Sequence, residues 1–136
     1  MEGVLPMWNE FRLSAAIVGT AISEWVGGLD GLLEALIVFM VIDYVTGVFC
    51  AVVEKKLSST VGFKGIFQKC LIVLLVGMAN AVDEHILGGT EHLLRTAVIF
   101  FYLSNEGISI LENAARLGLP IPDKLKDFLT QIKKGK

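Results

Sequence analysis

The sequence predicts an all-α integral membrane protein, and two observations carry that prediction. Apolar residues make up 54% of the 136 residues and charged residues 19%, with a mean hydropathy of +0.66. A single globular core of this size cannot bury so much apolar surface. Apolar runs also reach the length of about 20 residues that a helix needs to cross a bilayer. The formal net charge of −2, without a long basic stripe, excludes a nucleic-acid partner.

Residues 1–28 are predicted to form an N-terminal amphipathic helix. Its apolar side chains recur every three or four residues: Trp8, Phe11, Ala15, Val18, Ile22 and Trp25. Its polar side includes Asn9, Thr20, Ser23 and Glu24. We favour a helix that lies in the membrane interface, which leaves three spans in the chain. The alternative is that this helix also crosses the membrane, which gives four.

Residues 31–53 form the first predicted span, with Asp30 as the N-cap. Asp43 lies at its centre, where an aspartate costs roughly 2.5 to 3.5 kcal/mol on the insertion scale. The apolar neighbours offset this cost, but the carboxylate needs a polar partner. We therefore expect Asp43, with Tyr44, Thr46 and Gly47, to act in helix packing or pore lining.

The second and third spans are predicted at about 65–87 and 91–117. Asn80 interrupts the second span, and Thr90 is the expected N-cap of the third. Gly118 and Pro120 are a stop signal after the third. Counting from the span centres places Asp43 level with residues 77–80 and 102–105. Asn80 is accordingly a further candidate for helix packing.

A polar stripe runs along the third span at helical spacing. It consists of Asn105, Glu106, Ser109, Glu112 and Asn113, and the spacing predicts an ion pair between Glu112 and Arg116. Polar side chains in lipid must face protein or water, so the stripe is a candidate for assembly or pore lining. The alternative for its last two turns is that they protrude from the membrane. Thr20 and Ser23 of the N-terminal helix join the same candidate set.

Lysine and arginine residues are distributed unevenly between the predicted loops. A basic membrane-surface set comprises Lys55, Lys56, Lys64, Lys69, Lys124, Lys126, Lys133 and Lys134. The positive-inside rule then places the 54–69 loop and the C-terminus in the cytoplasm and the 83–92 loop outside. Residues 119–136 form a basic amphipathic tail suited to an anionic lipid surface.

No catalytic motif is present, so we expect neither an enzyme nor a cofactor. The outer loop contains His85 and His92 among acidic residues, but without a recognised spacing for metal ligands. A solvated loop explains these residues equally well. We therefore predict no metal site.

Residues 29–126 resemble the toxin-secretion/phage-lysis holin family. The resemblance rests on 43–47 (DYVTG), 65–69 (GIFQK), 104–113 (SNEGISILEN) and 118–122 (GLPIP). It implies a multi-pass protein of the bacterial cytoplasmic membrane that forms homo-oligomers among membrane lipids. It further implies holes through which a phage endolysin or a large protein toxin leaves the cell. The alternative is a small oligomeric membrane scaffold or channel that exports no protein.

Overall fold

The computed structural model describes residues 2–134, which form five helices and no strand. The helices are α1 (Val4–Trp25), α2 (Gly31–Val53), α3 (Ser59–His85), α4 (Leu93–Arg116) and α5 (Asp123–Lys134). For residues 129, 130 and 132–134, only the backbone is within this description. The all-helical prediction is confirmed, and α2 has the predicted bounds. Helix α3 begins at Ser59, six residues before the start of the second predicted span, whose bounds within the membrane stay a prediction.

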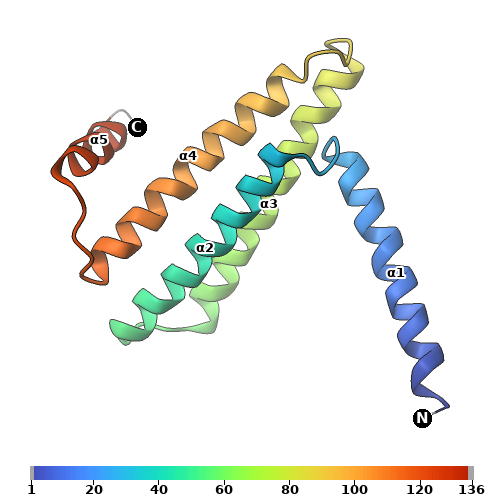
Figure 1. Ribbon diagram of the computed structural model, residues 1–136, viewed down its shortest axis with the longest axis horizontal. Helices are drawn as coiled ribbons and strands as arrows, with labels where there is room; N and C mark the ends of the chain where they lie inside the picture. The colour runs from blue at the N-terminus through green and yellow to red at the C-terminus, as the bar shows by residue number, and fades with distance from the viewer. Residues whose placement is uncertain (1, 135–136) are drawn as a thin grey trace.

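Helices α2, α3 and α4 lie side by side as a bundle (Figure 1). Helices α2 and α4 run in the same direction. Helix α3 is antiparallel to both, and leads from the end of α2 back to the start of α4. The main packing is between α4 and each of the other two helices, since α2 and α3 contact each other far less. Side chains that reach inward from the three helices therefore meet along α4.

Side-chain caps start α2 and α3. Asp30 accepts a hydrogen bond from the Leu33 N–H at 3.0 Å, which confirms the predicted N-cap. Ser58 is the N-cap of α3, and its hydroxyl oxygen accepts a hydrogen bond from the Val61 N–H at 3.2 Å. Each cap satisfies one of the backbone donors that a helix leaves free in its first turn.

The predicted cap of the third span is wrong. The N-cap of α4 is His92 rather than Thr90, and His92 makes no side-chain cap. The acceptor comes instead from α3, because the Asp83 carboxylate accepts from the N–H groups of Leu94 and Arg95 at 3.0 and 2.8 Å. This carboxylate is buried and ties the start of α4 to the end of α3.

The bundle has an apolar exterior, and its interior combines an apolar core around Leu36, Val76 and Ile99 with buried polar and charged side chains. Its buried polar and charged residues are Asn80, Asp83, Arg95, Glu106 and Asn113. Large apolar side chains cover the outer surface, among them Val38, Phe49, Phe67, Leu74 and Phe100. An apolar exterior of this extent is typical of contact with lipid. Among the described residues, α2 and α3 are long and apolar enough to cross a membrane.

Helix α1 projects away from the bundle and contacts it at one end (Figure 1). The Trp25 ring lies directly over Gly77 of α3, where a Cβ atom would collide with it. The Trp25 carbonyl also accepts a hydrogen bond from Asn80 Nδ2 at 3.0 Å. The remainder of α1 is exposed, apart from Ser23, which is half-buried. The predicted helix is therefore confirmed, while its place in the membrane stays a prediction.

Substituting Gly77→Ala should displace the Trp25 ring from α3. The added methyl group has no room beside the ring, so either the ring or the helix must move. In a Trp8→Phe background, we expect the fluorescence of Trp25 to change in detergent micelles. The control is Gly31→Ala, where a Cβ meets nothing within 4 Å. Unchanged Trp25 emission in the Gly77 variant would contradict this anchor.

Candidate functional site in the bundle interior

An ion triad links the three helices of the bundle. Lys69 Nζ of α3 lies 2.7 Å from Asp43 Oδ2 of α2 and 2.6 Å from Glu106 Oε2 of α4. The exposed fraction is 18% for the Lys69 side chain, 17% for Asp43 and 8% for Glu106. Charges so shielded from water interact strongly and must be paired to be tolerated. The polar partner that the sequence required for Asp43 is therefore this lysine.

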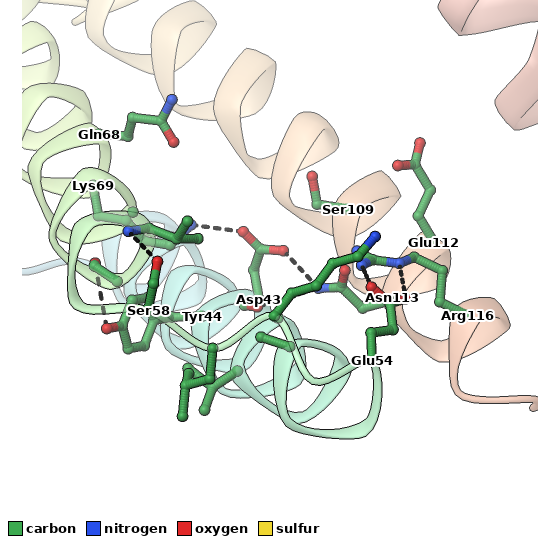
Figure 2. Close-up of a pocket in the computed structure, with 18 residues that line it drawn as sticks. Asp43, Tyr44, Glu54, Ser58, Gln68, Lys69, Ser109, Glu112, Asn113 and Arg116 are labelled. Carbon is green, nitrogen blue, oxygen red and sulfur yellow. Dashed lines mark hydrogen bonds and ion pairs between the residues drawn. The ribbon is translucent and has the colours of Figure 1, made fainter.

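The other side of Asp43 is held by Asn113 of α4 (Figure 2). Asn113 Nδ2 donates to Asp43 Oδ1 at 3.2 Å, to the Asp43 backbone carbonyl at 3.2 Å and to Thr46 Oγ1 at 2.9 Å. Its own backbone carbonyl accepts from Cys50 Sγ at 3.3 Å. Four hydrogen bonds to Asn113 thus join α2 to α4.

Two predictions about depth and exposure are wrong. Lys69 does not belong to the basic surface set, because its side chain turns inward to Asp43 and Glu106. Asn80 does not lie level with Asp43, since it binds the Trp25 carbonyl at the other end of α3. The start of α3, which shifts the centre of that helix toward Lys69, accounts for part of both errors.

Two hollows open onto the triad. One, of about 420 Å³, extends among all three helices from Asp43 and Lys69 to Glu54 and Arg116 (Figure 2). The other, of about 440 Å³, lies between α3 and α4 and reaches Glu106. Both are lined by Asp43, Gln68, Lys69, Ser109 and Glu112. We call the two together the polar vestibule.

Glu54 and Arg116 close the helix ends at the mouth of the polar vestibule. Arg116 donates to the two Glu54 carboxylate oxygens at 3.1 and 2.7 Å. These bonds join α4 to α2, and Glu112 also interacts electrostatically with Arg116, so the predicted pairing along α4 stays a prediction. Hydrogen bonding to Arg116 holds the pKa of the Glu54 carboxyl below its ordinary value. Glu112 lines the polar vestibule.

A second charged cluster lies at the opposite end of the bundle, around Arg95. Its guanidinium is buried and donates to the backbone carbonyls of Val26 and Gly28 and to the Asp30 carboxylate, 2.8 Å away. Arg95 therefore fixes the connection between α1 and α2 against α4. We assigned no role to Arg95 from the sequence. The acidic residues Asp30 and Asp83, at the same predicted membrane face, were the signal that could have revealed it.

Stability should depend on pH through Asp30. Hydrogen bonding to Arg95 lowers the pKa of Asp30 from its ordinary value of 3.8. The contribution of this carboxylate is therefore complete above about pH 4 and is lost as the pH falls through the lowered pKa. The difference in Tm between the wild type and Asp30→Asn should shrink over that range. A difference that grows on acidification would contradict the assignment.

The other predicted residues have varied surroundings. Tyr44 donates from its hydroxyl to the Gly62 carbonyl at 3.4 Å, and Gly47 and Ser109 line the polar vestibule. Asn105 lines the hollow between α3 and α4. Thr20 binds the Ala16 carbonyl within α1, far from the triad. The exposed lysines are Lys55, Lys56, Lys64, Lys124 and Lys126. Lys133 and Lys134 have side chains outside the described residues.

A helical bundle with an apolar exterior and an interior ion triad defines a small membrane protein. The chain belongs to the bacteriophage holin family, whose family model matches residues 20–134. A probable holin of Bacillus phage phi105 is 39% identical over 74% of this chain and 73% of its own. An uncharacterised 14.9 kDa protein from the nagH 3′ region of Clostridium perfringens is 40% identical over the full length of both chains. No solved structure matches significantly.

Proposed function

We propose that this protein is a pore-forming holin that assembles with copies of itself in the bacterial cytoplasmic membrane. The pore would release a folded protein, either a phage endolysin or a large toxin. Membership of the holin family and the similarity to the phi105 probable holin support the class of function. The observation that carries the proposal is the polar vestibule, which a lone bundle in lipid would leave facing hydrocarbon.

Polar side chains in a bilayer must be covered by protein or wetted by water. Gln68, Ser109 and Glu112 of the polar vestibule lie between α3 and α4, with the charged triad beneath them. A second copy of the chain could cover this surface, and a ring of copies could turn it toward a water-filled hole. One surface would thus serve both the assembled closed state and the open pore.

The proposed topology has three spans, α2, α3 and α4, with the C-terminus in the cytoplasm. Helix α4 enters this set because it runs beside α2 over its length, from Arg95 near Asp30 to Arg116 near Glu54. The exposed lysines of the α2–α3 connection and of α5 support the orientation. Helix α1 lies at the membrane surface, and lysines of α5 attract anionic lipid.

Labelling of single cysteines should test this topology. In a Cys50→Ala, Cys70→Ala background, an impermeant thiol reagent applied to intact cells should label Thr90→Cys and spare Gly135→Cys. The uneven distribution of lysines is the physical reason. Permeabilised cells, in which both positions should react, provide the control. Labelling of the tail with protection of residue 90 would reverse the orientation.

Release from vesicles should test pore formation. The purified full chain in vesicles is expected to release both a small dye and a trapped folded protein once a threshold density is reached. A channel would release the dye alone, and a scaffold would release neither. Either of those two results would overturn the proposed function.

A further inference from the structure

We propose that the Asp43–Lys69–Glu106 triad is a proton-binding site, in which the two carboxyl groups share one proton at neutral pH. The ligand is a proton taken from water in the polar vestibule. Once it is bound, the triad is neutral. Without the proton, the interior of the bundle carries one net negative charge.

The geometry supplies two carboxylates for one cation. Asp43 Oδ2 and Glu106 Oε2 both lie within 2.7 Å of the same Lys69 nitrogen. Two carboxylates that share a site rarely ionise together, because each disfavours the charge of the other. The cost of an unbalanced charge is greater inside a membrane bundle than in water. Binding of one proton removes this imbalance.

The groups packed around the triad supply no further compensating cation. From α2 the neighbouring groups are Asp43 itself and the Thr46 hydroxyl, which binds Asn113. From α4 they are Glu106, the Asn113 amide and Glu112, which adds an acid to the polar vestibule. The charged residues at the mouth, Glu54 and Arg116, bind each other. Lys56 lines the same hollow but belongs to the exposed α2–α3 connection.

The polar vestibule provides a route by which the proton can reach the triad. The hollow of about 420 Å³ runs from Asp43 and Lys69 to the helix ends at Glu54 and Arg116. The polar side chains of Gln68, Ser109 and Glu112 line both hollows, so water can occupy the route. In the opposite direction the interior is closed by apolar residues, which include Leu36, Val76 and Ile99. The site therefore exchanges protons from one side of the bundle.

Infrared spectroscopy of the full chain in lipid vesicles tests this proposal, because a protonated carboxyl group has its own C=O band. At neutral pH, Asp43→Asn and Glu106→Gln should each lose the band of one protonated carboxyl. In each variant the remaining carboxylate pairs with Lys69 and holds no proton. Lys69→Met should gain the band of one further carboxyl, because neither acid then has a cation.

The matched control is Glu112→Gln, which also lines the polar vestibule and should keep the wild-type band. A band that persists unchanged in both Asp43→Asn and Glu106→Gln would overturn the proposal, because the triad would then hold no proton. Loss of the band in Glu112→Gln alone would place the proton elsewhere and overturn it as well. The measurement requires no pore, so its failure is distinguishable from failure of the proposed function.

Discussion

Substituting Arg95→Ala is expected to lower the free energy of unfolding by about 3–5 kcal/mol. Removing one partner of a buried ionic network leaves the others without compensation. Here the substitution leaves the carbonyls of Val26 and Gly28 without their hydrogen-bond donor and Asp30 without its cation. Unfolding in mixed micelles measures the change. We also expect α1 to lose its fixed direction, since its connection to α2 is held by this side chain.

The matched control is Arg116→Ala, which removes an arginine from the exposed pair at the other end of α4. Exposed ion pairs contribute little, so this variant should unfold close to the wild type. Similar destabilisation of both variants would mean that arginine content, rather than the buried contacts of Arg95, sets the stability.

Substituting Lys69→Met should also destabilise the bundle, by about 3 kcal/mol or more. It removes the cation that holds Asp43 of α2 and Glu106 of α4 together, and leaves two shielded acids without a cation. The exposed Lys64, five residues earlier in the same helix, provides the control as Lys64→Met. Equal stability of the two variants in micelles would contradict the role assigned to the triad.

Stability should return when all three members of the triad become apolar. Replacing a buried ionic network with apolar residues of similar volume is often neutral or stabilising. Asn113 tolerates the loss of the Asp43 carboxylate, because the Asp43 backbone carbonyl and Thr46 Oγ1 still accept its hydrogen bonds. We therefore expect Asp43→Leu, Lys69→Met, Glu106→Leu to be at least as stable as the wild type in lipid.

The sequence was sufficient to predict the helices and the need for a partner at Asp43. The bounds of α2 follow from a long, predominantly apolar run after Asp30, a strong N-cap signal. The stop at Gly118 follows similarly, because that residue has a φ of +92°, which favours glycine. Local patterns of this kind depend on neighbours in the chain, so they can be read without a structure.

The partners across the bundle could not be predicted, because they depend on the register between helices. The second predicted span begins after Lys64. Its centre therefore lies nearer the C-terminal end of α3 than the observed centre does. With the observed start at Ser59, that centre is Ile72. The shift of four residues moves the predicted level of Asp43 from 77–80 to 73–76, which is still at least one helical turn from Lys69. The helix bounds therefore account for part of the difference, and the register between the packed helices accounts for the rest.

The Arg95 cluster was missed for a different reason. Hydropathy treats an arginine near a span end as a residue that reaches water, and most do. Here the connection between α1 and α2 folds over that end and offers the carbonyls of Val26 and Gly28 to the guanidinium. A non-local loop contact of this kind leaves no periodic signal in the sequence.

We infer that the Asp43–Lys69–Glu106 triad serves the opening of a pore rather than the stability of the fold. The most direct test measures the release of a trapped folded protein from vesicles. It compares the wild type, at equal inserted density, with the variant Asp43→Leu, Lys69→Met, Glu106→Leu. We expect the wild type to release the protein and the stable, inserted variant to retain it. Release by the variant at the wild-type rate would contradict it.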